Sequence, residues 1–428
     1  MALGLTLVLG GSPARADHTD PTQPQVPLVG DPLGEGLALG EGSWDHIKHF
    51  VANPGSDVKF FTMGGDIWAS SGTLGQGNQG FIGQRILRLT EDGEVNPTWI
   101  ADHGSAKCQL NTAVTGLQHD QAVTPATNPR LMVDSTDALG RCHDPSGGGL
   151  ELIDISELGQ EGFEVRETHL IRFRGFSHTV TADPRRRGIF YNSTSDSNTP
   201  NLWIDVVDAR SCLVRGTLEE KRDACRPSVY RLSWEDHPEW SQRRRPDGTL
   251  EPGTATACHD ITTAGSRLYC AGLNATLIFD VRGMFGRGNT INGQALSCPI
   301  IDGTSTGAKV TDCNVAGPGT PELATGWRFL GSFNHPGRPP GQQNNNLETP
   351  ADEGVSVSHE SDPSPDGRWL FVTDERGGGV VPPGASCSPG VDNPFGNGGI
   401  HVFDIGDPSN IHYAETVDGD KAIWRGEE

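Results

Sequence analysis

Short apolar runs recur along the chain, separated by polar stretches that are rich in glycine, proline, asparagine and aspartate. Each run is only a few residues long and contains mostly valine, isoleucine, leucine, phenylalanine, tyrosine and tryptophan. Branched and aromatic side chains in short runs bounded by turn residues are typical of β-strands. The pattern predicts an all-β protein, with strands at residues 131–133, 150–155, 189–192, 202–206, 268–270, 277–281, 370–373 and 400–405.

The runs belong to an internal repeat. Four copies share one order: a histidine start, a turn, an apolar run, a variable polar loop, and a second apolar run with an aspartate near its end. The copies start at His119, His178, His259 and His359. The aspartates of the second runs are Asp154, Asp205, Asp280 and Asp404. We expect these aspartates to fix turns, because the side chain readily hydrogen-bonds the backbone two residues further on.

A fourth strand completes each unit, for example within residues 163–172 and 327–332. Four-stranded units repeated around an axis form a β-propeller, so each copy is predicted to be one blade. A degenerate earlier copy over residues 45–102, with strands at 58–62 and 85–89, makes five blades partly visible. The steps between copies exceed the about 40–50 residues of a compact blade, which places the extra residues in loops. An array of β-sandwiches is the alternative, since regular strand spacing also fits it.

Composition and charge narrow the functional classes. The 57 glycines and 30 prolines make up about a fifth of the 428 residues, which is too much for a helical bundle. The formal net charge of −22 repels phosphate backbones and anionic lipid, so no nucleic-acid partner is expected. No apolar segment approaches the about 20 residues of a spanning helix, so no transmembrane segment is expected either.

The N-terminus has the pattern of an export signal, because a short apolar run precedes Ala14-Arg15-Ala16, an A-x-A cleavage pattern. We expect a signal peptide at residues 1–16, a proline- and glycine-rich segment at 17–44, and the propeller at 45–428. The nine cysteines fit a secreted or cell-surface protein, since an oxidising compartment permits disulfides. Spacing favours the local pairs Cys212–Cys225, Cys258–Cys270, Cys298–Cys313 and Cys108–Cys142, and leaves Cys387 over.

The second runs of the copies, such as Leu152-Ile153-Asp154 and Val402-Phe403-Asp404, resemble those of the LVIVD-repeat family of secreted β-propeller proteins. The segments that start at Cys258-His259 and Ser358-His359 are also similar to that family. The resemblance covers the chain from about residue 45 and implies a propeller without a general catalytic activity. It also implies a further blade with a Cys-x-Ala-His-like segment, whereas this sequence stops at Glu428. On this resemblance the chain is either truncated, with six or seven blades when complete, or closed in an unusual way.

The repeated histidines are the main candidate site. Each starts the innermost strand of its blade, so the four rings are expected to converge on the central channel. Converging imidazoles suit copper, zinc, nickel or iron. The candidate ligands are His119, His178, His259 and His359. Three acidic residues directly follow a histidine, and because adjacent strand residues point to opposite sides, we expect them to support the ligands. They are Asp120, Asp260 and Glu360.

Two other interpretations of the histidines stay open. The rings can hydrogen-bond strand backbones without any metal, or they can take part in acid–base chemistry without metal. The arrangement is similar to that of selenium-binding-protein-like propellers, which use central histidines for copper, a similarity at the level of the fold.

The polar loops offer a second kind of site. Oxygen-rich stretches at residues 134–144, 192–196 and 374–393 have the donors that Ca²⁺ prefers, although solvated loops are the alternative. The sequence has no motif of serine hydrolases, NTPases, nicotinamide enzymes or zincins. It therefore predicts a secreted propeller with a metal or small-ligand site at its centre. The alternative is a non-catalytic extracellular or cell-surface scaffold that binds another protein.

Overall fold

Strands dominate the computed structural model of the chain. The structure describes residues 55–73, 83–91, 94–104, 120–125, 128–136, 148–173, 176–195, 201–245, 247–302, 307–313, 323–335, 355, 358–374, 399–416 and 422–424. Within these residues the helical elements are α2 (Leu218–Ala224) and the 3-10 turns η1 (Arg210–Cys212), η2 (Pro238–Ser241), η3 (Arg282–Met284) and η4 (Arg287–Asn289). No helix in this part of the chain is long and apolar enough to cross a membrane.

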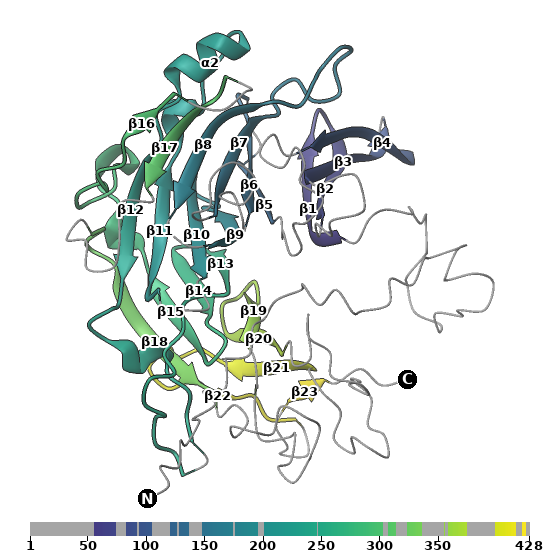
Figure 1. Cartoon of the computed structure of the whole chain (residues 1–428). Helices are drawn as coiled ribbons and strands as arrows, with labels where there is room; N and C mark the ends of the chain where they lie inside the picture. The colour runs from purple at the N-terminus through teal and green to yellow at the C-terminus, as the bar shows by residue number, and fades with distance from the viewer. Residues whose placement is uncertain are drawn as a thin grey trace, which may run out of the picture.

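Five sheets follow one another around a common centre and form the blades of a β-propeller (Figure 1). Blade 1 contains β1 (Gly55–Met63), β2 (Asp66–Thr73), β3 (Gly83–Glu91) and β4 (Glu94–Gly104). Blade 2 contains β5 (Gln121–Val123), β6 (Leu131–Thr136), β7 (Gly149–Asp154) and β8 (Glu167–Phe173). Blade 3 contains β9 (Phe176–Ala182), β10 (Ile189–Ser195), β11 (Trp203–Asp208) and β12 (Ser228–Ser233).

The last two blades are built in the same way. Blade 4 contains β13 (Asp260–Ala264), β14 (Arg267–Ala271), β15 (Ala275–Asp280) and β18 (Arg328–Asn334). Blade 5 contains β19 (Ser358–Pro363), β20 (Trp369–Asp374), β21 (Gly399–Asp404) and β22 (His412–Tyr413), and β23 (Ile423–Trp424) also pairs with β21. All eight strands predicted from the repeat are confirmed, with boundaries that differ by a residue or more. The ring arrangement of the sheets shows that the sandwich alternative was wrong.

Successive blades meet in a constant way. The first strand of each blade lies against the first strand of the next, from β1 on β5 to β13 on β19. The second strand of each blade also contacts the first strand of the next blade, in the pairs β2–β5, β6–β9, β10–β13 and β14–β19. The first strands therefore surround the centre of the propeller, as the sequence predicted.

Buried apolar side chains fill each of the four junctions between neighbouring blades. Phe61 and Trp68 of blade 1 pack with Met132 and Ile153 of blade 2. Val133 and Leu152 of blade 2 pack with Phe190 and Val207 of blade 3. Tyr191 and Val206 of blade 3 pack with Leu268 and Phe279 of blade 4. Tyr269 and Ile278 of blade 4 pack with Leu370 and Phe403 of blade 5. Neighbouring residues of one strand thus pack in two different junctions. This is expected for a strand that is buried on both faces, because successive side chains point to opposite faces.

The connection between β15 and β18, residues 281–327, runs back along the outside of the propeller, and we call it the strap. Its described parts contact the outer strand of blade 3, where Leu296 N donates to Val229 O (2.7 Å) and Ala324 N donates to Arg231 O (2.6 Å). Two of its strands, β16 (Ile300–Ile301) and β17 (Lys309–Cys313), extend blade 2, with β17 parallel to β8. The expectation that such insertions are only loops was wrong here, because the open edge of β8 pairs with an added strand.

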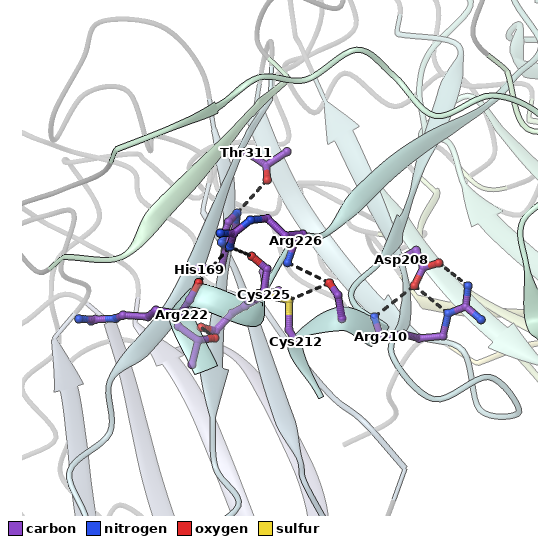
Figure 2. Close-up of a disulfide and its surroundings, with 11 residues drawn as sticks. His169, Asp208, Arg210, Cys212, Arg222, Cys225, Arg226 and Thr311 are labelled. Atoms are coloured by element: carbon purple, nitrogen blue, oxygen red, sulfur yellow. Dashed lines mark hydrogen bonds and ion pairs between the residues drawn. A yellow bond between two sulfur atoms is a disulfide. The ribbon is translucent and has the colours of Figure 1, made fainter. Parts of the chain in front are cut away.

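A second insertion, between β11 and β12, ties blade 3 to blade 2. It contains η1 and α2, and the disulfide Cys212–Cys225 joins the two (Figure 2). Lys221 of α2 lies 3.0 Å from the carboxylate of Asp154 in blade 2, and Arg222 Nη2 donates to Glu167 O (3.0 Å). The insertion therefore acts as a clamp between the outer parts of the two blades.

Three of the predicted disulfides are confirmed, namely Cys212–Cys225, Cys258–Cys270 and Cys298–Cys313. The second of these joins the start of the first strand of blade 4 to its second strand, as expected from the hairpin between them. The proposed pair Cys108–Cys142, the remaining Cys387 and the predicted signal peptide lie outside the described residues.

Candidate functional site

Three of the four repeated histidines lie at the start of a first strand, where neighbouring blades meet at the centre. His178 belongs to β9, His259 directly precedes β13, and His359 belongs to β19. His178 is 4% exposed and His259 is 2% exposed, whereas His359 is half-buried. The fourth, His119, lies outside the described residues.

His178 and His259 meet directly, although 81 residues separate them in sequence. Their Nε2 atoms are 2.7 Å apart, and their ring centroids are 4.2 Å apart with an edge-to-face arrangement. The next blade continues the row, since the ring centroids of His259 and His359 are 4.4 Å apart. The prediction that these side chains converge is therefore confirmed for the three histidines that the structure describes.

The hydrogen bonds of His259 identify which of its nitrogens carries the proton. Its Nδ1 lies 3.2 Å from the backbone carbonyl oxygen of His359, and a carbonyl oxygen can only accept. In the neutral ring Nδ1 is therefore the donor, and the lone pair is on Nε2, directed at His178. A ring nitrogen held by a backbone carbonyl while the other presents its lone pair is the usual arrangement of a histidine ligand.

Carboxyl groups gather beside the histidines. Asp120 is buried, and Asp260 and Glu360 are half-buried. The carboxylate of Asp120 accepts from Gln121 N and Val180 N, at 2.6 Å each, and so joins blade 2 to blade 3. The carboxylate of Asp260 accepts from Ile261 N at 2.6 Å. The carboxylates of Asp120 and Asp260 thus bind backbone amides at the starts of the first strands.

Burial and mutual repulsion alter the protonation of these carboxyls. Burial raises the pKa of Asp260 to about 6. Burial, with repulsion from Asp260, Asp362 and Asp57, raises the pKa of Glu360 to about 7. The pKa of Asp120 is also well above its usual range, first because of burial and then because of its hydrogen bond with Asp57 and repulsion from it. The centre of the propeller is therefore a region of negative potential in which carboxyl groups hold protons near neutral pH.

Sequence reasoning missed two members of this carboxyl cluster, Asp57 on β1 and Asp362 on β19. Asp57 lies near the start of the first strand of blade 1, at the place that Asp120 and Asp260 hold in their own blades. Ser56, and not a histidine, directly precedes this aspartate, so Asp57 falls outside the sequence repeat. A comparison of strand starts alone would have found it.

The predicted turn aspartates are confirmed at three positions and wrong at one. Asp154 accepts from Ser156 N, Asp280 from Arg282 N, and Asp404 from Gly406 N, at 2.8–2.9 Å. Asp205 instead lies inside β11 and binds Arg231 at 3.1 Å, because the strand continues to Asp208. Asp208 takes the turn position and accepts from Arg210 N at 3.1 Å.

The structure adds no Ca²⁺ geometry to the polar loops, most of which lie outside the described residues; Asp134, Asn192 and Asp374 are buried on strands. In the described part of the chain, no group of three or more His, Cys, Asp or Glu side chains is arranged to hold a metal ion. That part does not include His119.

No family model matches the sequence, and no curated protein is significantly similar to it. Similar solved structures include a chain of ctPRC2 in complex with H3K27me3 and H3K27M, with 11% identity, a TM-score of 0.32, and coverage of 84% of this chain and 68% of that one. The Cps50 (Swd1) β-propeller domain of Myceliophteria thermophila has 8% identity, a TM-score of 0.32, and coverage of 83% and 88%. RS223-β-xylosidase has 10% identity, a TM-score of 0.30, and coverage of 86% and 95%. These values are too low to assign any property of those proteins to this chain.

Proposed function

We propose that the centre of this propeller binds a transition-metal ion through its repeated histidines. The observation that carries the proposal is the 2.7 Å separation of the Nε2 atoms of His178 and His259, on neighbouring blades. Nitrogens bound to one tetrahedral ion at about 2.0–2.1 Å are about 3.3 Å apart, so the rings need to separate by only about 0.6 Å. The carbonyl-bound Nδ1 of His259 keeps its Nε2 lone pair available for such an ion.

His359 would supply a third nitrogen and His119 a fourth, from the two adjoining blades. Imidazole ligands suit copper, zinc, nickel and iron. The nearby carboxyls Asp120, Asp260 and Glu360 favour a cation at the centre, because they lower the electrostatic potential there. Bound metal would supply Lewis-acid or redox chemistry to a small ligand at the central channel. The protein's own residues would position the ion and stabilise its charge.

The proposal includes export and membership of the LVIVD-repeat family. Three disulfides support an oxidising compartment, and the apolar run before Ala14-Arg15-Ala16 supports a cleaved signal. The strands that end in Asp154, Asp280 and Asp404 support the family resemblance, because the same turn closes each of them.

The metal site is tested by elemental analysis of the exported protein and by calorimetric titration of chelator-treated protein with Zn²⁺, Cu²⁺ and Ni²⁺. We expect one ion per chain, and weaker binding below about pH 6, because only neutral imidazole is a ligand. His259→Ala should abolish stoichiometric binding. His237→Ala is the matched control, because the His237 side chain is 52% exposed on the surface. Absence of metal from the exported protein together with no uptake in the titration would overturn the proposal.

A second function is a non-catalytic extracellular scaffold. It is favoured by large apolar side chains on the surface of the two end blades, with Phe60 64% exposed and Phe371 41% exposed. Exposed apolar patches of this kind mark interaction surfaces. The two functions separate in one experiment, since His259→Ala would leave such an interaction intact.

A further inference from the structure

Leu273 has a backbone conformation that a leucine seldom adopts. It lies in the turn that joins β14 to β15 with a φ of +57°, and among the described residues Asn289 is the other non-glycine residue with a positive φ. Asparagine tolerates this left-handed region, whereas the β-carbon of a leucine crowds its own backbone there. A strained conformation persists only where the surrounding structure holds it, and such positions gather at functional sites.

The turn around Leu273 is held from both sides. Gly272 has little room for a side chain, because a β-carbon there would lie 3.0 Å from a backbone carbonyl oxygen. Asn274 O accepts from His335 N at 2.8 Å, and Asn274 Oδ1 accepts from Arg243 Nη2 at 2.9 Å. Leu273 is therefore fixed between two anchored neighbours, which maintain its conformation.

The left-handed conformation directs both backbone groups of Leu273 at blade 5. Leu273 N donates to Ser358 O at 3.1 Å, and Ser358 N donates to Leu273 O at 2.9 Å. The two residues thus form an isolated antiparallel bridge between the turn of blade 4 and the start of β19. A third contact supports the bridge, since Ser358 Oγ lies 3.1 Å from Thr276 Oγ1. Ser358 is fully buried, so water does not compete for these contacts.

Ser358 directly precedes His359, and the sheet of blade 5 does not fix that histidine. The register of β19 with β20 shifts between Ser358 and Glu360, which leaves His359 as the extra residue of a β-bulge. A bulged residue has no partner of its own on the neighbouring strand, so its direction depends on the contacts that hold the residues beside it. The bridge from Leu273 holds one of those residues.

The position of His359 in turn decides which nitrogen of the next ring carries a proton. The carbonyl oxygen of His359 lies 3.2 Å from His259 Nδ1, and this contact places the proton of the neutral His259 ring on Nδ1. The Nε2 lone pair then faces His178 Nε2, 2.7 Å away. A displaced carbonyl would free His259 to take the other tautomer, in which Nε2 carries the proton and cannot bind a metal.

The other two histidines of the row are held in a different way. The carbonyl oxygen of His178 accepts from Ser135 Oγ at 2.9 Å, and that of His259 accepts from Thr179 Oγ1 at 3.0 Å. In each case a hydroxyl group of the preceding blade holds the histidine backbone. At the third histidine the preceding blade supplies the backbone of Leu273 instead.

We propose that Leu273 is a positioning residue of the central site, which fixes the backbone of His359 and through it the tautomer of His259. The bridge is a backbone contact, so it depends on the left-handed conformation and the N–H of residue 273 rather than on the leucine side chain. An effect on metal affinity rests on the proposed metal function, whereas the tautomer of His259 is a property of the metal-free protein.

Nitrogen NMR of histidine-labelled, metal-free protein tests the tautomer, because it distinguishes a protonated ring nitrogen from one with a lone pair. At about pH 8, where imidazole is neutral, we expect wild-type His259 to carry its proton on Nδ1. The signals of His259 are those that disappear in His259→Asn. Leu273→Pro removes the N–H and fixes a negative φ, so His259 should become a mixture of the two tautomers.

Two further variants separate the bridge from a general loss of order. Leu273→Gly permits the left-handed conformation and should keep the wild-type tautomer of His259. Asn289→Pro is the matched control, since Asn289 also has a positive φ and donates its N–H to Gly286 O, but it lies exposed in η4. If Leu273→Pro does not fold by circular dichroism, Leu273→Val replaces it, because a β-branched residue disfavours a positive φ.

Calorimetric titration with Zn²⁺ measures the consequence for the proposed site. The affinity should fall about 10- to 100-fold in Leu273→Pro, the usual loss when a group that orients a histidine ligand is removed, and should not change in Leu273→Gly or Asn289→Pro. A folded Leu273→Pro or Leu273→Val variant in which His259 keeps its proton on Nδ1 overturns the inference, as does loss of that tautomer in Leu273→Gly. A wild type that binds no Zn²⁺ overturns the metal function alone, and the NMR result still decides the role of Leu273.

Discussion

Blades 2, 3 and 4 differ from blades 1 and 5 in how they are held. The three middle blades have a neighbour on each side, and the strap and the α2 insertion also join them along the outside. The three confirmed disulfides all belong to these blades or their insertions. Among the described residues, each end blade packs against a neighbouring blade on one face and carries exposed apolar side chains on the other. The comparison shows that the same repeat unit serves two purposes: internal support in the middle and an available surface at the ends.

The largest expected difference between the regions is at the pair Tyr269 and Phe371, which occupy one repeat position. Tyr269→Ala should lower the free energy of unfolding by about 3–5 kcal/mol, because it empties a buried aromatic site between blades 4 and 5. Phe371→Ala should cost less than about 1 kcal/mol in dilute protein, since Phe371 already contacts water. Urea unfolding measures both. Equal losses at the two positions would remove the distinction between a covered and an open face.

The next effect concerns the strap. Cys298→Ser combined with Cys313→Ser opens a disulfide with a sequence separation of 15 residues. Loss of chain restriction in the unfolded state should cost about 3 kcal/mol for a loop of this size. The measurement is urea unfolding of the double variant beside the wild type. A loss below about 1 kcal/mol would show that the strap adds little to the stability of the middle blades.

The junction of blades 4 and 5 should be sensitive to acid through His335. The ring is fully buried and its Nε2 lies 3.0 Å from Thr276 Oγ1; burial, and then the nearby His401, lower its pKa from 6.5 to about 3. The unfolded chain binds this proton below about pH 6.5 and the folded chain does not, so stability falls as the pH drops from 6.5 towards 3. At pH 5.5 the cost is on the order of 1 kcal/mol.

The pH dependence can be divided between two regions. His169, on β8 beside the strap, also has a pKa lowered to about 3, by burial first and then by Arg226 and Lys309. His335→Asn should therefore remove only part of the loss of folding stability between pH 7 and pH 5.5. His412 is exposed on β22, so His412→Asn should remove none of it. Thermal unfolding at both pH values measures this. A pH dependence that His335→Asn leaves unchanged would contradict the assignment.

The smallest effect is expected on the exposed side of blade 5. Arg368 lies 3.3 Å from Asp404, and its side chain is 59% exposed. Asp404→Asn removes this ion pair but keeps an oxygen that can accept from Gly406 N, so the loss should stay below about 1 kcal/mol. The free energy of unfolding of the variant should be the same at low and high salt. That of the wild type should fall by a few tenths of a kcal/mol at high salt.

Much of the fold was predictable because each strand carries its own local pattern. Runs such as residues 277–281 and 370–373 predicted their strands, and the repeat predicted that first strands and their histidines meet at the centre. The strap was not predictable in this way, because β17 pairs with β8 across about 140 residues, as in the contact of Arg172 with Asp312. No short-range periodicity reports a pairing over that separation.

The site was predictable only where the repeat is regular. His178 and His259 share a sequence context, and the structure brings them together. Asp57 has no preceding histidine, so its place in the carboxyl cluster depends on blade geometry rather than on a motif. Asp205 and Asp208 are three residues apart at the end of one strand, and only the backbone hydrogen bonds show which of them makes the turn.

The backward course of the strap sets an order for the synthesis of this protein. Blade 2 cannot obtain its fifth strand until residues 309–313 have been made, long after β8 has left the ribosome. At a synthesis rate of about 5–20 residues per second, the edge of β8 stays unpaired for roughly 7–28 s. An unpaired edge invites wrong pairing with other chains during that time. The same route constrains evolution, because the loss or duplication of blade 3 or blade 4 alone would separate β17 from the strand that it completes.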